Sequence, residues 1–465
     1  MGAVPQHWVS SKVKNLARPG YKTFVDGDWI ESPYITGEGI RLIQTGNIGV
    51  GAYREKGFRY INEGTFHAFG CTEFQPGDVL ICRLGEPVGR ACLAPDLGVR
   101  MITSVDVCIL KLREDVLPAY VVYAMSSPRY LDWVSSLVRG STRDRVSRNM
   151  LGGFVVPVPP VLEQAAVVRF LGHADRRIRH YIRAKQKLIK LLEEQKQVII
   201  HHAVTRGLDP NVRLKASGVP WVGDIPEHWE VRSAKHLFRE VDHRSATGTE
   251  VLLSLRMYHG LVPHNELSRI PITAQALVGF KKVKCGQIVM NRMRAAIGMF
   301  GLVHQSGLVS PDYAVFEPIA DLDAMYFLRL FKTPAAGTIF RIESKGLGTG
   351  SSGFMRLYAD RFGMIKLPVP PREEQTRIVL GIARNIQEIE CSEERINREI
   401  SLLLEFRSRL IADVVTGQLD VREAAAKLPP EREELEPIDD AATLVESEEA
   451  LNESDLDAKA VEEHV

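Results

Sequence analysis

Four arginines lie within ten residues of one another in the stretch VRGSTRDRVSRNML, and they are Arg139, Arg143, Arg145 and Arg148. An arginine guanidinium can bind a phosphate or bridge O6 and N7 of a guanine base. The hydroxyls of Ser141 and Thr142 can also donate hydrogen bonds to phosphate oxygens. The stretch therefore predicts a contact with nucleic acid, and the alternative is an ordinary solvated polar loop.

A second stretch of small and basic residues, ESKGLGTGSSGFMRL, occupies the matching place in the second half of the chain. Its candidate contacts to nucleic acid are Lys345, Ser351, Ser352 and Arg356. It contains fewer arginines than the first stretch, so base contacts are less strongly indicated. The other basic candidates are Arg83, Arg292 and Arg294, with Arg41, Arg90, Lys281 and Lys282 as weaker ones. Some of these strand residues are expected to be structural.

Signatures of catalysis are missing from the sequence. There is no phosphate-binding G-x-x-x-x-G-K-[ST] motif, and the glycine-rich run at Gly346 has no lysine after it. No NPPY or DPPY run is present to hold a flipped base. The six cysteines form no C-x-x-C pair, which is typical of reduced thiols in a cytosolic protein. We expect no catalytic residues and no metal site in this chain.

The chain is an internal duplication. VPQHW at Val4 recurs as IPEHW at Ile225, and VPVPPVLEQ at Val156 recurs as LPVPPREEQ at Leu367. The proline stretches are each followed by a long charged segment that ends in VTRGLD or VTGQLD. Two such copies predict a pseudo-two-fold arrangement of two similar units, which is the intramolecular form of a symmetric dimer.

The front part of each copy has the pattern of a mixed α/β domain. Short apolar or alternating runs predict strands, and these runs are DVLICRL, DVCILKL, QIVMNRM and YAVFEP. One helix is predicted near Leu117 to Leu137, with a counterpart near Ala324 to Phe331.

The rear part of each copy has a seven-residue apolar repeat typical of a coiled-coil seam. In the second copy the seam includes Ile389, Ile396, Leu403 and Leu410, and in the first it includes Ile178, Ile182, Ile189, Leu192, Ile199 and Ala203. Four polar residues interrupt the seams, namely Lys185, Lys196, Glu393 and Arg407. Each pattern runs for about 26 residues, or roughly 39 Å of helix. Mutual antiparallel pairing is favoured over two helices that pack separately on their own domains.

The fold class is therefore predicted as α+β, with two mixed α/β domains separated by two long antiparallel helices. We expect domain 1 at 1–155, a proline-rich segment with helix 1 at 156–210, a linker at 211–224, domain 2 at 225–366, a proline-rich segment with helix 2 at 367–421 and a disordered acidic tail at 422–465. The tail has 15 acidic and 4 basic residues, so the preceding chain is basic. A basic body suggests a polyanionic partner, although an acidic tail can serve solubility alone.

The combination of P-x-H-W, P-x-P-P-x-x-E-Q and V-T-x-x-L-D, each present twice and in order, resembles the specificity subunit of type I restriction–modification systems. The resemblance covers roughly Val4 to Val421. It implies two target-recognition domains, each of which reads one half of a split DNA sequence, and a coiled coil that spaces them. The subunit would be non-catalytic and would direct adenine-N6 methylation and, with a motor subunit, cleavage.

The resemblance also implies partners and cofactors. The partners would be double-stranded DNA, two methyltransferase subunits and two restriction or motor subunits. S-adenosylmethionine, ATP and Mg would be bound by those subunits, and this chain would bind no cofactor. Residues Glu163, Gln164, Glu374 and Gln375 are candidates for docking the methyltransferase, or they belong to the first turns of the helices, where acidic residues are favoured.

Two other classes of function compete with this prediction. One is a stand-alone DNA methyltransferase, against which the missing motifs argue, and the other is a coiled-coil scaffold that binds only protein. The first residues lack the basic and apolar regions of a signal peptide, so none is expected, and there is no long apolar run. With the resemblance, this predicts a protein of the prokaryotic cytoplasm that does not bind a membrane.

Overall fold

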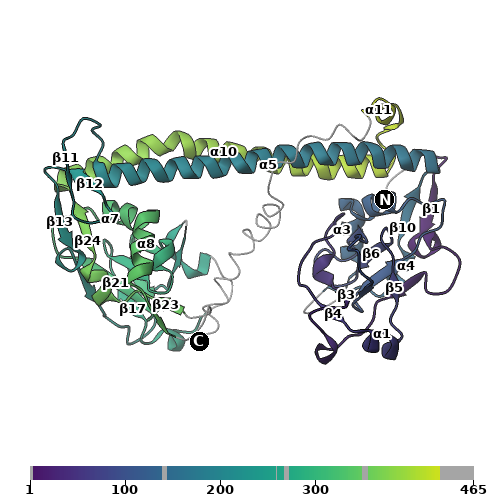
Figure 1. The fold of residues 1–465 in the computed structure, drawn as a ribbon, viewed down its shortest axis with the longest axis horizontal. Helices are drawn as coiled ribbons and strands as arrows, with labels where there is room; N and C mark the ends of the chain where they lie inside the picture. Colours follow the sequence, from purple (N-terminus) through teal and green to yellow (C-terminus); the bar gives the residue numbers. More distant parts are fainter. Residues whose placement is uncertain (1–3, 139–143, 258, 267–271, 348–353, 430–465) are drawn as a thin grey trace. The chain divides into compact units, whose positions relative to one another are not determined.

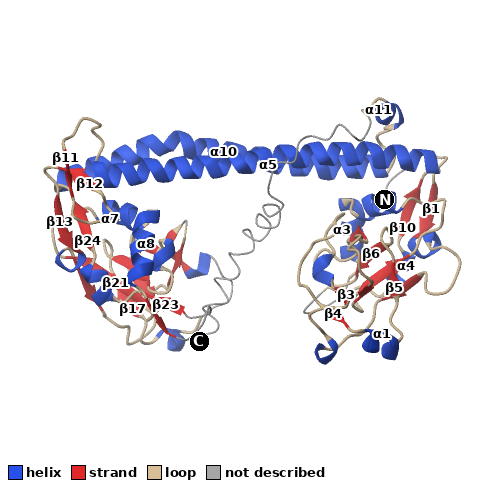
Figure 2. Cartoon of the chain, in the orientation of Figure 1, coloured by secondary structure: helices blue, strands red, loops and turns tan. Residues whose placement is uncertain are grey.

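The computed structural model describes residues 4–138, 144–257, 259–266, 272–347 and 354–429, and the chain divides into two compact units (Figures 1 and 2). Unit 1 holds the described residues up to Ala184 together with those from Arg398 onward, and unit 2 holds Lys185–Asn397. Each unit combines a β-rich head, meaning the part outside the long helices, with a portion of both long helices α5 (Val161–Arg206) and α10 (Arg372–Val415).

The head of unit 1 contains two four-stranded sheets and short helices. Its strands are β1 (Val9–Lys12), β2 (Phe24–Asp26), β3 (Ile40–Ile43), β4 (Tyr60–Ile61), β5 (Glu73–Phe74), β6 (Val79–Cys82), β7 (Ala91–Leu93), β8 (Met101–Thr103), β9 (Val107–Leu110) and β10 (Val155–Val158). Its helices are α1 (Glu63–Phe69), α2 (Pro118–Met125), α3 (Pro128–Ser136) and α4 (Arg148–Gly153), and α11 (Arg422–Ala426) follows α10 in the same unit.

The head of unit 2 has one four-stranded sheet and several two-stranded ones. Its strands are β11 (Leu214–Ala216), β12 (Asp224–Pro226), β13 (Glu230–Ser233), β14 (Phe238–Val241), β15 (Leu253–Arg256), β16 (Gly260–Pro263), β17 (Lys281–Val283), β18 (Ile288–Asn291), β19 (Phe300–Leu302), β20 (Gly307–Val309), β21 (Tyr313–Pro318), β22 (Lys345–Leu347), β23 (Phe354–Arg356) and β24 (Lys366–Val369). Its helices are α6 (Ala274–Leu277), α7 (Ala324–Phe331), α8 (Pro334–Glu343) and α9 (Ala359–Met364).

Each head has its own central sheet, and the two sheets are built in the same way, which confirms the duplication seen in the sequence. The strand order is β2-β9-β6-β7 in unit 1 and β14-β21-β18-β19 in unit 2, and every pair is antiparallel. All four runs predicted as strands are strands, at β6, β9, β18 and β21. Along β6, Val79 and Ile81 face one hydrophobic cluster while Leu80 and Cys82 face another, because successive side chains of a strand alternate between faces.

The helix predicted near Leu117 to Leu137 is two helices in the structure. Helix α2 ends at Met125 and α3 starts at Pro128, with Ser127 in an extended conformation. Proline disfavours helical backbone in the residue before it and has no N–H to donate, so the chain starts a new helix there. The counterpart in unit 2 repeats this break, since Thr333 is extended and α8 starts at Pro334.

The two long helices pack against each other in antiparallel directions within each unit, as predicted. In unit 1, Val167 and Leu171 of α5 share a hydrophobic cluster with Ile411 and Val414 of α10. In unit 2, Ile200 and Ala203 of α5 lie in the cluster that holds Ile378, Ile382 and Ile386 of α10.

Polar residues of the seam pair across the two helices. Lys196 Nζ lies 2.8 Å from a Glu393 carboxylate oxygen in unit 2. In unit 1, Arg407 forms an ion pair with Asp175, which is 4% exposed. Such half-buried charges favour one register because a shifted register would leave them unpaired.

Four of the six cysteines are buried and two, Cys285 and Cys391, are exposed. Burial raises the pKa of Cys71 to about 11 and that of Cys92 to about 12, so both thiols stay protonated and unreactive at neutral pH. We expect iodoacetamide at pH 8 to label Cys285 and Cys391 in the folded chain and the other four only in urea. Peptide mass spectrometry checks this, and labelling of Cys92 without urea would contradict the burial.

No helix among the described residues is long and apolar enough to cross a membrane. Within the same residues, no group of three or more histidine, cysteine or carboxylate side chains could hold a metal ion.

Candidate nucleic-acid interface

The basic stretch of unit 1 is anchored at its C-terminal end by Arg83, which directly follows β6. The Arg83 carbonyl accepts a hydrogen bond from Val146 N at 3.0 Å, and Gly85 N donates to the Asp144 carbonyl at 3.0 Å. Residues 144–146 therefore run beside residues 83–85, and this pairing is the stem of the first loop.

The Arg83 side chain is buried and is held from several sides. Its Nε lies 3.1 Å from Asp26, its Nη2 lies 3.7 Å from Asp106, and it donates to the Val105 carbonyl at 2.7 Å and to the Val146 carbonyl at 3.3 Å. The residue is 6% exposed. A guanidinium so enclosed favours a positioning role at the loop stem over the predicted contact with DNA.

Two of the predicted arginines lie at this stem and remain partly exposed. Arg145 forms an ion pair with Asp106 at 2.7 Å and is 52% exposed, while Arg148 lies 3.7 Å from Asp26 and is 43% exposed. Arg148 is the first residue of α4, which is capped by Ser147. The structure thus brings Arg145 and Arg148 together around one pair of carboxylates. The predicted contacts Arg139, Ser141, Thr142 and Arg143 lie outside the described residues.

Unit 2 builds its second loop stem in the same way. The Arg292 carbonyl accepts a hydrogen bond from Leu357 N at 2.9 Å, and its guanidinium lies 2.7 Å from Glu240. Arg356 lies 3.8 Å from Asp312, in the place that Arg145 and Asp106 take in unit 1. The Arg292 side chain is 21% exposed and paired with Glu240, which favours a positioning role, and its contact with DNA stays a prediction.

The remaining candidates of unit 2 have varied surroundings. Lys345 is exposed and stands opposite Arg356 in the β22–β23 hairpin, and Arg294 is exposed after β18. Ser351 and Ser352 lie outside the described residues. Lys281 is 2% exposed, and burial lowers the pKa of its ammonium group, which favours a structural role over a DNA contact.

The carboxylates of the two stems were not predicted from the sequence. They are Asp26 and Asp106 in unit 1, and Glu240 and Asp312 in unit 2. One signal was available, because a Ser-x-Asp pattern ends in Asp106 in the first copy and in Asp312 in the second.

The proline stretches and the tryptophan motifs meet at the starts of the long helices. In unit 1, Glu163 accepts hydrogen bonds from His7 at 2.8 Å and Trp8 Nε1 at 2.9 Å, and it lies 3.4 Å from Arg422. Gln164 is fully buried, where it accepts from Leu117 N and donates to the Pro159 carbonyl, both at 2.8 Å.

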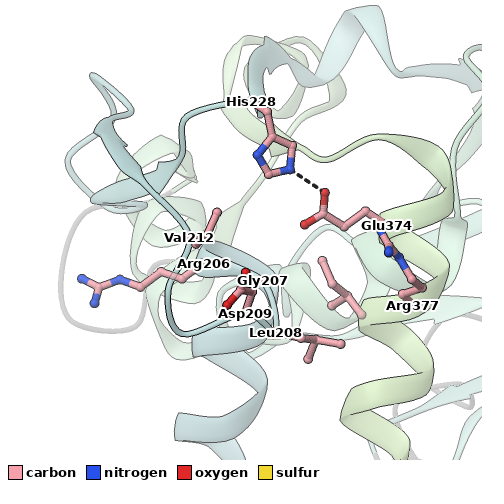
Figure 3. Close-up of a pocket in the computed structure, with 9 residues that line it drawn as sticks. Arg206, Gly207, Leu208, Asp209, Val212, His228, Glu374 and Arg377 are labelled. Carbon is pink, nitrogen blue, oxygen red and sulfur yellow. Dashed lines mark hydrogen bonds and ion pairs between the residues drawn. The ribbon is translucent and has the colours of Figure 1, made fainter.

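The helix start in unit 2 repeats this junction. Figure 3 shows the His228 ring pointing toward the Glu374 carboxylate, 2.7 Å away, beside a pocket of about 300 Å³ that Arg206, Asp209 and Arg377 help to line. Gln375 is 1% exposed and accepts from Asp323 N at 2.7 Å. The four predicted docking residues thus serve contacts within their own units. The geometry favours the helix-start alternative, and docking through these side chains stays a prediction.

The C-terminal end of each long helix packs against the head that belongs to the other sequence copy, so α10 ends at the head of unit 1 and α5 ends at the head of unit 2. Tyr120 donates to the Val415 carbonyl at 3.4 Å in unit 1, and Tyr326 donates to the Val204 carbonyl at 2.8 Å in unit 2. Gly417 and Gly207 then end the helices with φ of 72° and 80°, a left-handed conformation that glycine tolerates best. A Cβ on Gly417 would lie 2.5 Å from Pro5, so the approach also requires glycine.

Comparisons with known proteins agree with this architecture. Residues 259–402 match the family described as the type I restriction modification DNA specificity domain. The chain is 20% identical, over 74% of its length and 79% of the relative, to a putative type I restriction enzyme MjaX specificity subunit of Methanocaldococcus jannaschii.

A solved structure shares the fold. It is described as the structural basis of complex assembly and conformational transition of the type I R-M system, and it has a TM-score of 0.62 at 15% identity, covering 90% of this chain and 100% of that one. The HsdS subunit of Thermoanaerobacter tengcongensis is 16% identical, with a TM-score of 0.43 over 90% of this chain and 98% of its own. The domain match and the curated relative point to one group of proteins, so the chain is similar to the DNA specificity subunits of type I restriction–modification systems.

Proposed function

We propose that each unit of this chain reads one half of a bipartite DNA target and that the paired long helices set the gap between the halves. The chain directs the chemistry without performing it. Two methyltransferase subunits carry S-adenosylmethionine and methylate adenine at N6, and two motor subunits that use ATP and Mg add cleavage.

The observation that carries this proposal is a repeated stem with unlike loops. Arg83 with Val146 and Arg292 with Leu357 form the same backbone pairing, yet VRGSTRDRVSRNML and ESKGLGTGSSGFMRL differ. A common frame with different side chains suits the reading of two different half-sites. Phosphate contacts would position each head and contacts to base edges would specify the sequence.

The residues proposed to touch DNA are those that the heads leave accessible. The cations Arg145 and Arg148 of unit 1 and Lys345, Arg356 and Arg294 of unit 2 are at least partly exposed. The carboxylates beside Arg145 and Arg148 would weaken the attraction of these two arginines to phosphates, which every DNA sequence has. Tight binding would then require sites where base contacts add to the affinity.

The outward faces of the long helices fit a role in docking the methyltransferase subunits. In unit 2, Leu188, Leu191 and Val198 of α5 are 46%, 52% and 68% exposed. In unit 1, Leu402 and Phe406 of α10 are 59% and 56% exposed and one helical turn apart. Apolar rows outside the helix seam are typical of interaction surfaces.

Shortening both helices by one heptad tests the spacing function. We expect deletion of Ile182–Leu188 from α5 together with Arg395–Ser401 from α10 to keep both inter-helix ion pairs and shorten the spacer by about 10 Å, or roughly three base pairs. The methylated motif, mapped by sequencing of the host genome, should then have a shorter gap or be lost.

The control for this deletion is Lys187→Ala with Lys190→Ala, which changes one exposed residue inside the deleted segment and one just after it without changing the length of α5. An unchanged gap in the shortened chain contradicts the spacing function. The two competing functions are tested on the same preparations. Binding of the complex to random duplexes that does not weaken with salt rejects phosphate contacts, and methylation by this chain alone identifies a stand-alone enzyme.

A further inference from the structure

A second basic loop lies in the head of unit 1, at residues 54–59, between β3 and β4. Its sequence REKGFR carries three cations, Arg54, Lys56 and Arg59, against the single carboxylate of Glu55. Every residue from Arg54 to Arg59 is exposed, and the Phe58 side chain is 65% exposed.

The backbone of this loop is held by Arg41, a buried arginine of β3. Arg41 is 1% exposed and donates to the carbonyls of Gly57 at 3.0 Å, Arg59 at 3.2 Å and Lys56 at 3.5 Å. Its guanidinium also lies 5.1 Å from the centre of the Phe58 ring. Burying a guanidinium is costly unless its donors are satisfied, and here the loop carbonyls accept from Nη1 and Nη2, while Nε has no acceptor among the described residues.

A second buried side chain, Asn47, holds the start of the loop. Its Nδ2 donates to the carbonyls of Arg54 at 3.0 Å and Lys56 at 2.6 Å, while Arg54 N donates to the Asn47 carbonyl at 2.8 Å. The loop is therefore built before any ligand arrives. A preformed loop loses little conformational entropy on binding, which favours specific recognition.

Arg90 connects this loop to the stem of the first loop. Arg90 donates to the carbonyls of Thr45 at 3.0 Å and Ile48 at 2.6 Å, on both sides of Asn47. It also donates to the Leu84 carbonyl at 3.3 Å, and Leu84 is bridged to Arg145 in the stem. The two basic loops thus share one continuous hydrogen-bonded support.

We propose that the loop 54–59 is a second DNA-contacting element of unit 1. Arg54, Lys56 and Arg59 bind phosphates, and Phe58 makes an apolar contact with a base edge, such as a thymine methyl group. Arg41 and Asn47 are positioning residues. The proposal rests on the proposed function, because it assigns further contacts to the half-site that unit 1 reads.

The test uses the complex of the full chain with its methyltransferase subunits. The combined change Arg54→Ala, Lys56→Ala and Arg59→Ala should weaken binding to random duplexes and reduce the slope of log affinity against log salt by about 0.9 for each phosphate that the loop no longer binds. The control with the same change in charge is Lys12→Ala, Lys14→Ala and Arg18→Ala, three exposed residues of the same head, which should leave the slope unchanged.

Phe58→Ala tests base reading. Bound sequences selected from a randomised duplex library should lose about tenfold of their discrimination at a position in one half-site, with the other half-site unchanged. Arg41→Lys keeps the charge but loses the forked donors, so it should reproduce part of both effects.

Urea midpoints of all complexes check that the variants fold. A wild-type complex that selects a bipartite sequence, with loop variants that match it in slope, affinity and selected bases, overturns the inference and leaves the proposed function intact. A wild-type complex that selects no sequence overturns the proposed function and the inference with it.

Discussion

Replacing Arg83 by methionine is expected to destabilise unit 1 by on the order of 3 kcal/mol and to abolish recognition of one DNA half-site. The substitution leaves Asp26 and Asp106 without their buried partner and removes the donors to the carbonyls of Val105 and Val146. The two carboxylates then keep only the partly exposed Arg145 and Arg148 beside them, and the first loop loses its buried side-chain anchor. Urea unfolding measures the stability, and mapping of methylated adenines measures the recognition.

Arg113→Met is the matched control for Arg83→Met. Arg113 lies in the same head and pairs with Asp115, but its side chain is 37% exposed and its partner 61%. An exposed pair contributes about 0–1 kcal/mol, so this variant should stay close to wild type. If the two substitutions changed stability and recognition equally, burial of Arg83 at the loop stem would not explain its effect. Arg292→Met, in unit 2, should affect the other half-site.

Replacing Trp229 by alanine is expected to cost about 3–5 kcal/mol in unit 2, because it opens a cavity in the core. Trp229 is fully buried and its ring packs edge-on against Tyr326, with 6.5 Å between centroids. Tyr326 in turn holds the end of α5 through the Val204 carbonyl. The loss should therefore loosen the junction at which α5 ends, and amide hydrogen exchange in Ala324–Phe331 measures this directly.

The control for Trp229→Ala is Trp29→Ala, since Trp29 is 68% exposed and its removal should change the stability by no more than about 0.5 kcal/mol. Trp229→Phe separates packing from hydrogen bonding. The indole Nε1 of Trp229 has no acceptor among the described residues, so phenylalanine should recover most of the stability. Trp8→Phe removes a donor to Glu163, so it should recover a smaller share of the stability that Trp8→Ala loses. A larger recovery at Trp8 than at Trp229 would contradict this difference in hydrogen bonding.

Local patterns in the sequence were enough for the strands and the helix seam. Runs such as DVLICRL alternate between two apolar faces, and the seven-residue repeat requires only neighbours along one helix. The interruptions of the seam were also visible, but their pairing was not. Lys196 meets Glu393 because the helices pack antiparallel in one particular register. That register depends on contacts between residues that lie far apart in sequence, 197 positions for this pair.

The burial of individual side chains in the candidate site was not visible in the sequence. The basic stretches and their stems lie where the duplication places them, yet Arg83 looked like a contact and is a buried anchor. Arg41, a weaker candidate for a nucleic-acid contact, is buried and holds a loop whose exposed side chains were not predicted as contacts. A side chain's burial depends on the surfaces that the fold brings to it, and those lie far away along the chain.

The amino-acid sequence alone established that the chain is duplicated, that its strands and long helices alternate in a set order, and that it resembles the DNA specificity subunits. The duplication and the order of elements follow from spacing and periodicity, which are local or repeated, and the resemblance rests on the motifs that the chain carries twice. The closure of each head by the helix end of the other copy became visible in three dimensions only. Tyr120 reaches the Val415 carbonyl across 295 positions, and such contacts arise because packing selects partners by shape and hydrogen bonding, whatever their distance in sequence.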